Sequence, residues 1–337
     1  MWLQGDTLVN VWYFLLGFIL ALYVILDGFD IGVGILSLFI DRRQSRAVLM
    51  SSLSTVWDAN EAWLIIWGGA LFGAFPLAYA TVFNALYIPI TGLLVSLIFR
   101  GISFEFYSLA GRKRIWSLAF GLGSLGAAIF EGCILGGVLS GIRVDRNGMF
   151  AGGLFDWVNS VSAVVVIDVI AGFSLLGATY LIYKTERKIQ EAARKWTLIF
   201  SIVVFTLAMV TAFLLPVIDP EMAASLLAHA RPAELLAVFL TNALFIVALV
   251  ICLERRSEPF PFIFALLVFL VTFGALWTAE YPYLVPGAIT AHMAAARHNT
   301  LEFMLAGIGP VIPVIMTYNF YIYRVFRNKV REGEVYY

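Results

Sequence analysis

Four carboxylic acids lie inside two neighbouring apolar stretches of the sequence. Asp27 and Asp30 belong to the run LDGFDIG, and Asp58 and Glu61 belong to the run VWDANEAW. The members of each pair are three residues apart, which places them on one face of a helix. Because a carboxylate in apolar surroundings is energetically costly, such a cluster indicates a function. These residue types predict proton or cation transfer.

The composition identifies the surroundings of these acids as a membrane. Of the 337 residues, 61% are hydrophobic and 13% are charged, whereas about 25% are charged in soluble domains. We expect an all-α polytopic membrane protein with one integral-membrane domain over residues 1–337. Stretches of about 20 apolar residues predict nine transmembrane helices, at 8–40, 48–74, 79–103, 115–140, 157–183, 196–216, 233–253, 260–280 and 299–323.

The basic residues predict the orientation of these helices. Seventeen of the 22 Lys and Arg residues fall in loops after odd-numbered spans or in the C-terminal tail. The positive-inside rule then places the N-terminus outside and the C-terminus in the cytoplasm. The segment Met1–Asp6 has no basic n-region, so we do not expect a removable signal peptide. The net charge is zero, and we expect no nucleic-acid partner.

The two acid pairs are expected to share a depth in the membrane. At about 1.5 Å per residue, Asp30 lies roughly 18 Å from Arg42, and Asp58 lies roughly 18 Å from Arg46. Spans one and two are joined by a short loop and should be antiparallel neighbours. The four acids could therefore face one water-filled cavity. A purely structural set of buried, hydrogen-bonded acids is the alternative.

Small residues explain how the first span could accommodate its acids. Gly28, Gly32 and Gly34 would let a neighbouring helix pack closely against this span. Trp57 on the second span is expected to pack against a neighbouring helix rather than against a flat ligand. Asn60 could bridge the acids by hydrogen bonds.

The third span contributes Arg100 and Glu105, which we expect at its cytoplasmic end. Glu105 could receive protons there, or the two residues could form an interfacial ion pair that anchors the helix end. Glu131 and Asp168 are further single acids inside predicted spans four and five.

Other kinds of site have little support. A b-type haem in a helical bundle needs axial ligands, commonly His, at membrane depth. His229, His292 and His298 are expected in loops or at a helix end, so we expect neither a haem nor a metal site in this chain. Cys133 and Cys252 stand alone in separate spans and are expected to be packing residues. No nucleotide-binding or hydrolase motif is present.

Four sequence runs resemble the second subunit of bd-type quinol oxidases. They are DGFDIGVG at 27–34, WDANEAWL at 57–64, GGALFGAFP at 68–76 and FRGISFEF at 99–106. The first two are the most specific, and a weaker likeness extends over the whole chain. The last run also resembles the cyanide-insensitive branch of this family.

This resemblance implies a fold of two four-helix bundles plus one peripheral helix, in a bacterial or archaeal cell membrane. It implies a partner, subunit I, that carries two haems b, one haem d and the quinol site and reduces O2 to water. The present chain would stabilise that subunit without an obligatory haem of its own. Small single-helix accessory subunits are further possible partners. Whether a quinone or a lipid fills the groove where the related subunit holds haems is left open.

The resemblance also implies roles for individual acids. It assigns a cytoplasmic proton route to Asp30, Asp58 and Glu105. Because Glu105 is expected past the inner end of span three and the two aspartates roughly 18 Å in, we expect Glu105 to be the entry and the aspartates the inner relay. Asp27 and Glu61 would add proton-carrying groups. Glu105 stands where the family pattern leads us to expect Asp, and Glu61 stands where an amide can occur.

A secondary transporter that uses the buried acids as ion sites is the alternative function. Transporters usually contain helices interrupted by Gly or Pro near the midplane. Most prolines of this sequence are expected near span ends, with Pro89 as the mid-span exception. This distribution favours the oxidase subunit.

Overall fold

The protein is described by a computed structural model that covers residues 5–40, 43–109, 113–218 and 232–331. Its order of elements is α1 (Gly5–Ser37), α2 (Arg43–Leu53), α3 (Trp57–Ala74), α4 (Pro76–Ala85), α5 (Tyr87–Leu109), α6 (Lys113–Leu139), α7 (Ser160–Lys184), α8 (Arg187–Ile218), α10 (Pro232–Glu254), α11 (Pro259–Ala279), β1 (Tyr283–Val285), β2 (Ile289–Thr290), α12 (Ala291–Ala294) and α13 (His298–Val325). The two short strands pair in antiparallel fashion.

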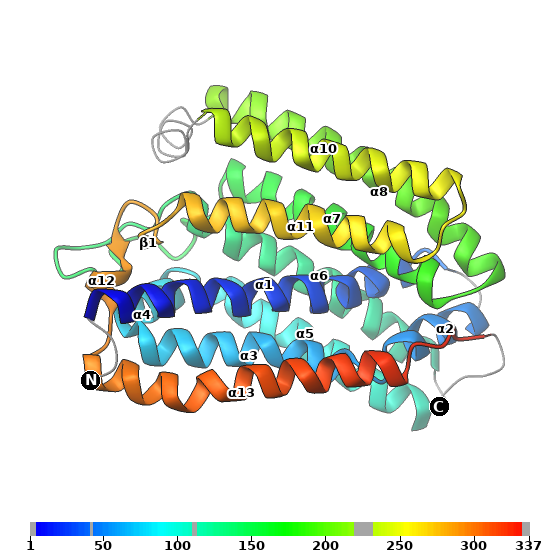
Figure 1. The fold of residues 1–337 in the computed structure, drawn as a ribbon, viewed down its shortest axis with the longest axis horizontal. Coiled ribbons are helices and arrows are strands. Elements are labelled where there is room, and N and C mark those ends of the chain that lie inside the picture. Colours follow the sequence, from blue (N-terminus) through cyan, green and yellow to red (C-terminus); the bar gives the residue numbers. More distant parts are fainter. Residues whose placement is uncertain (1–4, 41–42, 110–112, 219–231, 332–337) are drawn as a thin grey trace.

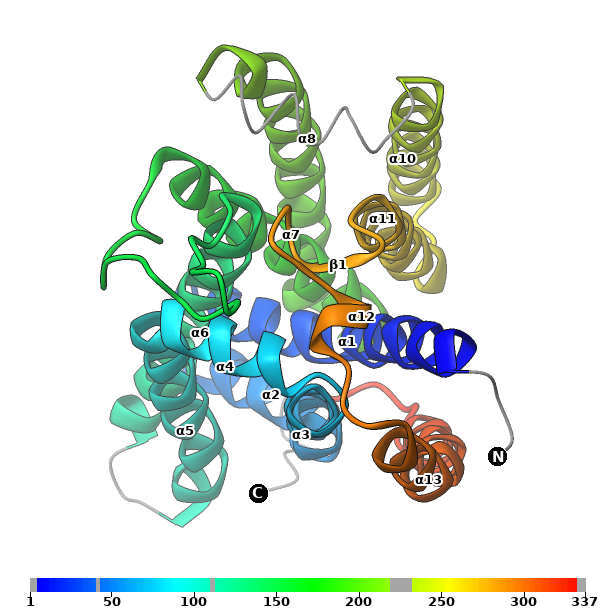
Figure 2. The same cartoon turned by 90° about the vertical axis from the view of Figure 1, so that its left-hand side faces the viewer.

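The long helices lie alongside one another, and α1 occupies the centre (Figure 1). It packs most extensively against α7, α3 and α6, and also contacts α11 and α13. Seen end-on, α8 and α10 lie on one side of α1, whereas α3, α5 and α13 lie on the other (Figure 2). The acids of α1 are therefore enclosed by several helices.

Eight helices in the described part of the chain are long and apolar enough to cross a membrane, namely α1, α5, α6, α7, α8, α10, α11 and α13. The expectation of an all-α polytopic membrane protein is thus supported. Helix α3 is not among the eight, because its 18 residues begin with the polar run WDANE. The ninth span and the two-bundle layout stay predictions.

Two predicted spans are divided differently in the structure. The predicted span 48–74 is broken between α2 and α3, where Ser52 and Ser54 donate hydrogen bonds to the carbonyls of Leu49 and Ser51. Such side-chain bonds compete with helix continuation. The predicted span 79–103 is also wrong at both ends, because α4 begins at Pro76 and a separate α5 runs from Tyr87 to Leu109.

Most described prolines lie near helix ends, as expected, but the mid-span exception is not Pro89. Pro89 is the third residue of α5 and not a mid-span residue, because α4 and α5 are separate helices. Pro310 and Pro313 instead lie inside α13, which continues from His298 to Val325. Proline in a helix interior removes a hydrogen bond and favours a kink.

Helices α1 and α7 touch backbone to backbone. A Cβ atom on Gly32 would lie 1.8 Å from the carbonyl oxygen of Phe173, and one on Gly177 would lie 2.4 Å from the carbonyl carbon of Gly32. This contact confirms that the glycines of the first span admit a close neighbour. In lipid, such close packing holds helices together, since lipid tails are as apolar as the side chains.

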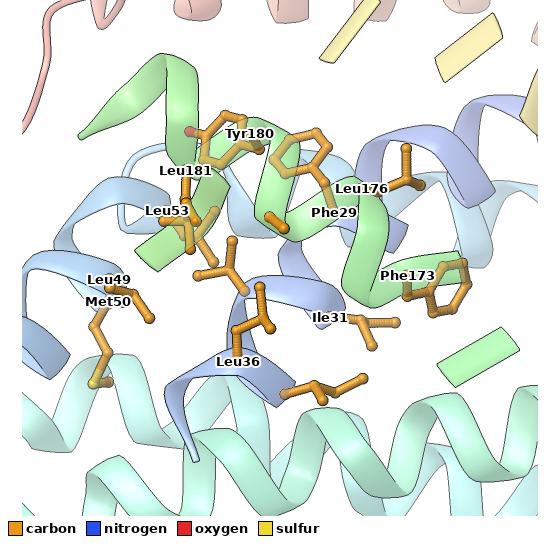
Figure 3. Packing of buried hydrophobic residues seen from close by; sticks show 14 of the residues in the cluster. Phe29, Ile31, Leu36, Leu49, Met50, Leu53, Phe173, Leu176, Tyr180 and Leu181 are labelled. Atoms are coloured by element: carbon orange, nitrogen blue, oxygen red, sulfur yellow. The ribbon is translucent and has the colours of Figure 1, made fainter. Parts of the chain in front are cut away.

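An apolar cluster surrounds this contact at the end of α1 that lies near α2 (Figure 3). Its members from α1, α2 and α7 include Phe29, Ile31, Leu36, Leu49, Met50, Leu53, Phe173, Leu176, Tyr180 and Leu181. The cluster fixes the position of α1, and with it the position of the acids on the opposite face of this helix.

Candidate proton-transfer site

Three polar residues form a stripe along α1. Tyr23, Asp27 and Asp30 are spaced by four and three residues, which places them on one face of the helix. Their exposed fractions are 3%, 0% and 1%. Because a buried polar group without a partner is costly, each of the three is expected to find a hydrogen bond outside α1. Each bonds to a different helix.

Asp27 pairs with Arg100 of α5. The Nη1 atom of Arg100 donates to Oδ2 of Asp27 at 3.0 Å, and Nη2 donates to Oδ1. Nη2 also donates to Oε2 of Glu61 on α3 at 3.2 Å. Both Arg100 and Asp27 have fully buried side chains, whereas Glu61 is 22% exposed. One guanidinium thus joins two carboxylates from separate helices.

The position of Arg100 corrects an expectation. This residue does not lie at a helix end, because α5 continues for nine residues beyond it, and its guanidinium binds Asp27 and Glu61. Helix α6 approaches α5 closely here, since a Cβ atom on Gly123 would lie 2.9 Å from the backbone nitrogen of Arg100. The long side chain of Arg100 reaches Asp27 from this position.

Asp30 is linked to α3 and α13. Nδ2 of Asn60 donates to Oδ2 of Asp30 at 2.9 Å, and the hydroxyl of Tyr323 donates to Oδ1 of Asn60 at 2.8 Å. The other carboxyl oxygen of Asp30, Oδ1, is buried and accepts no hydrogen bond from the described residues. Asn60, which we expect to bridge the acids by hydrogen bonds, therefore contacts Asp30 directly.

Tyr23 is linked to α6. Its hydroxyl donates to Oε1 of Glu131 at 2.5 Å. Glu131 is thus not the isolated acid that its sequence position indicates. The sequence does contain an indication of this contact, because Tyr23 lies one helical turn before Asp27 on the same face of the helix. No comparable signal exists for Tyr323, which is 263 residues from its partner Asn60.

Asp58 and Glu105 occupy a different environment from Asp27 and Asp30. Both are exposed on the surface of this chain. Asp58 lies in the first turn of α3, so the expectation that it is deep in a span is wrong. The break before α3 is the reason, because it turns the middle of the predicted span into a helix start.

A stacked pair of aromatic rings joins α3 and α5 beside these two exposed acids. The rings of Trp57 and Phe104 are 5.0 Å apart and nearly parallel, at 9°. The packing role expected of Trp57 is therefore confirmed. Asp58 and Glu105 directly follow these two residues in sequence, so they belong to the same level of the bundle. The expected separation in depth between them is wrong, because α5 extends beyond residue 103.

The described histidines lie at helix starts, as expected. His292 is in the short helix α12, and His298 is the first residue of α13 and lies 3.1 Å from Glu302. His229 lies outside the described residues. The interiors of the described membrane helices contain no histidine, so they do not fit a haem held by two histidines at membrane depth.

The buried polar side chains form three hydrogen-bonded groups: Tyr23 with Glu131, Arg100 with Asp27 and Glu61, and Asn60 with Asp30. The cited contacts of 2.5 to 3.2 Å are in the range that proton transfer needs. Within the described residues no group of three or more His, Cys, Asp or Glu residues could hold a metal ion. The fold and this site define a class: a polytopic helical membrane protein with buried carboxyls linked across helices.

Comparison with known proteins places the chain more narrowly. A family model for cytochrome bd terminal oxidase subunit II matches residues 8–326. The chain therefore belongs to the cytochrome bd terminal oxidase subunit II family, in agreement with the resemblance of its sequence runs.

Individual relatives agree with this assignment. Cytochrome bd-I ubiquinol oxidase subunit 2 of Escherichia coli K12 is 31% identical over 197 residues, which are 56% of this chain and 52% of that protein. The match thus spans about half the length of that relative. Cytochrome bd ubiquinol oxidase subunit 2 of Bacillus subtilis strain 168 is 26% identical over 341 residues, which cover 97% of this chain and 98% of that protein.

A solved structure shares the fold. A chain of the bd oxidase from Geobacillus thermodenitrificans superimposes with a TM-score of 0.80 and covers 95% of this chain and 98% of its own length. The sequence identity is 20%, so this likeness concerns the fold alone.

Proposed function

We propose that this chain is subunit II of a bd-type terminal quinol oxidase, which stabilises subunit I and supplies a cytoplasmic proton path for the reduction of O2 to water. The family assignment supports the first part. The observation that carries the second part is the stripe on α1, where each buried polar residue is hydrogen-bonded to another helix. Packing alone does not require so many buried acids in a membrane.

The haems of the oxidase are assigned in this proposal to the partner subunit. Two haems b and one haem d, with the quinol site, would lie in subunit I, because the described histidines of this chain stand at helix starts and do not fit axial ligation within the membrane. Such haems supply the electron-transfer and oxygen chemistry when bound. The residues of the present chain hold and move protons.

The proposed route begins at the exposed acids. With the N-terminus outside, Asp58 and Glu105 lie at the cytoplasmic end of α3 and α5 and collect protons there. Glu61, which is 22% exposed, is one turn further along α3 than Asp58 and leads to Arg100 and Asp27. Water is needed between these groups, since proton transfer requires contacts of about 3 Å.

A second inner branch of the route runs through Asp30. Its free carboxyl oxygen and its bond to Asn60 fit a group that exchanges a proton without moving far. The order of the route is therefore refined: Asp58 joins Glu105 at the surface, while Asp30 and Asp27 form the inner relay.

The visible spectrum of the complex tests this function. The chain is purified together with its partners, and the reduced-minus-oxidised difference spectrum is recorded. We expect the bands of haems b and d and quinol-dependent oxygen consumption. A haem-free preparation that instead couples solute uptake to a proton gradient in vesicles would support the secondary transporter and refute the oxidase subunit.

A further inference from the structure

The contact between Tyr23 and Glu131 extends the buried network beyond the acids assigned so far. We propose that Glu131 is an additional proton-carrying group and that Tyr23 is the residue that positions its carboxyl. This inference rests on the proposed function and deepens it, because it adds a third step to the stripe of polar residues on α1.

The geometry places this pair at one end of the stripe. Tyr23 lies four residues from Asp27, about 6 Å along the helix axis, on the side away from Asp30. Its hydroxyl is buried and donates to Glu131 at 2.5 Å. Glu131 itself is only partly buried in this chain. The pair thus lies between α1 and α6, one helical turn from the fully buried Asp27.

The charges of the cluster require bound protons. Arg100 interacts electrostatically with Asp27, Asp30, Glu61 and Glu131. Four carboxylates and this one guanidinium would carry a net charge of −3. Such a charge within a membrane is costly, which favours a cluster in which some of the carboxyls hold a proton. A cluster that holds protons at rest can pass them on.

A purely structural role for the pair is poorly supported. Helices α1 and α6 already approach closely without it, since a Cβ atom on Gly34 would lie 1.9 Å from the hydroxyl oxygen of Ser124. Gly121 of α6 makes a second close contact with α1, since a Cβ atom there would lie 3.0 Å from the hydroxyl oxygen of Ser37. A buried carboxyl is not needed to tie two helices that small residues already hold together.

The transfer step requires no electron donor or acceptor. A proton leaves the Glu61 carboxyl, crosses by way of water and is taken up by the Glu131 carboxylate, which becomes a carboxylic acid. The donor carboxyl becomes a carboxylate and is protonated again from the cytoplasmic side. The Tyr23 hydroxyl keeps its own proton in the net reaction and orients the accepting group.

Infrared difference spectroscopy of the assembled complex tests this proposal. Spectra are recorded between buffers of two pH values for the wild type, Glu131→Gln, Tyr23→Phe and Tyr13→Phe. We expect a carbonyl stretch of a protonated carboxyl that disappears in Glu131→Gln and shifts in Tyr23→Phe, because its hydrogen bond is lost. Tyr13→Phe is the matched control. It removes a buried hydroxyl from the same helix, but that hydroxyl bonds to backbone carbonyls.

Oxygen consumption at equal haem content gives the second readout. We expect Glu131→Gln to lower turnover about tenfold or more, Tyr23→Phe to lower it less, and Tyr13→Phe to leave it unchanged. If Glu131→Gln does not assemble, Glu131→Asp replaces it. The shorter acid keeps a carboxyl but draws it away from Tyr23, so its band should shift.

The possible outcomes separate this inference from the proposed function. An active oxidase whose carboxyl band or turnover is unchanged in Glu131→Gln would overturn the role of Glu131 alone. A carbonyl band of the protonated carboxyl that is unaltered in Glu131→Asp would also overturn the role of Glu131. A wild-type complex without haem bands and without oxygen consumption would refute the proposed function, whichever band is observed.

Discussion

At the scale of single residues, Asp27 and Arg100 show what a buried charge requires. Both side chains are fully buried, and the guanidinium binds both carboxyl oxygens of Asp27. The low dielectric of the surroundings makes such a pair strong, but it also makes either partner costly when left alone. The stability of the protein should therefore fall much more when one of the two charges is removed than when both are removed.

Replacement of Arg100 tests this reasoning. We expect Arg100→Gln to destabilise the protein by about 3–5 kcal/mol, because Asp27 is left buried without its cation. The double variant Asp27→Asn with Arg100→Gln should recover much of this loss. The thermal unfolding midpoint of the purified complex measures both effects. Arg143→Gln is the control, because Arg143 pairs with Asp156 in an exposed loop. If the midpoint falls equally in this variant, the loss in Arg100→Gln does not come from leaving Asp27 buried without its cation.

The network could be predicted from sequence only in part, for reasons that differ between residues. The spacing within DGFD and WDANE brought Asp27, Asp30, Asn60 and Glu61 together, because short-range helical periodicity suffices for this. The sequence does not predict Arg100 as the partner of Asp27, because the predicted span ends at residue 103 whereas α5 continues to Leu109.

Other contacts are set by tertiary structure and have no local signal. Tyr323 reaches Asn60 from α13, and Glu131 reaches Tyr23 from α6. Their positions depend on which helices are neighbours, which the pattern of apolar spans does not determine. Most span positions were predicted correctly to within a few residues, because length and apolarity alone determine them.

At the scale of helices, the contact between α1 and α7 positions the acids. Gly32 and Gly177 let the two backbones touch, so α1 is held on the face opposite to Asp27 and Asp30. Small residues serve this purpose in membranes because dispersion forces depend on close approach. The positions of Asp27 and Asp30 should therefore depend on Gly32, a residue that has no side chain.

Substitution of Gly32 by alanine tests this dependence. The new methyl group would overlap the carbonyl of Phe173, at 1.8 Å, so α1 and α7 must separate. We expect a lower thermal midpoint and weaker assembly of the complex. Gly274→Ala on α11 is the matched control, since a Cβ atom there meets nothing within 4 Å. The control variant should be neutral or slightly stabilising, because Ala favours the helix over Gly by about 1 kcal/mol. If the thermal midpoint falls equally in both variants, the contact between α1 and α7 is not the cause of the loss.

The segment after α13 is tied to the neighbouring loops at the same end of the bundle. Lys329 donates to Glu258 at 2.7 Å, Gln190 donates to the same carboxyl oxygen, and the amide of Val330 donates to the carbonyl of Lys184. The hydrogen bond from Lys329 lowers the pKa of Glu258 below its usual value. These contacts hold the end of α13, the helix that carries Tyr323.

The sign of the pH dependence follows from the lowered pKa. The contribution of Glu258 is fully present above the unfolded pKa of about 4.3 and is lost as the pH falls through the lower folded pKa. We expect Glu258→Gln to speed hydrogen exchange of the Val330 amide at neutral pH, measured by mass spectrometry. Glu191→Gln, which removes an exposed pair with Arg256, is the control and should leave the exchange rate of Val330 unchanged. An unchanged exchange rate in Glu258→Gln would show that these hydrogen bonds do not hold the segment after α13.

At the scale of the whole molecule, the acids differ in burial from the surface to the interior. Asp58 and Glu105 are exposed at one level, Glu61 is partly exposed, and Asp27 and Asp30 are buried. This gradient is what a path for protons from the cytoplasm requires. The family match extends over residues 8–326, so the network belongs to the part of the chain that is shared with the other members of the family.

Proton uptake during a single turnover tests the central claim most directly. The fully reduced complex is mixed with O2, and a pH-sensitive dye reports protons taken from the medium. We expect Asp30→Asn to slow this uptake by about tenfold or more, because an amide cannot carry the proton, while haem content stays equal to that of the wild type. Asp156→Asn, in an exposed loop, is the control and should behave as the wild type. Proton uptake at the wild-type rate in an assembled Asp30→Asn complex would contradict a proton path through this chain.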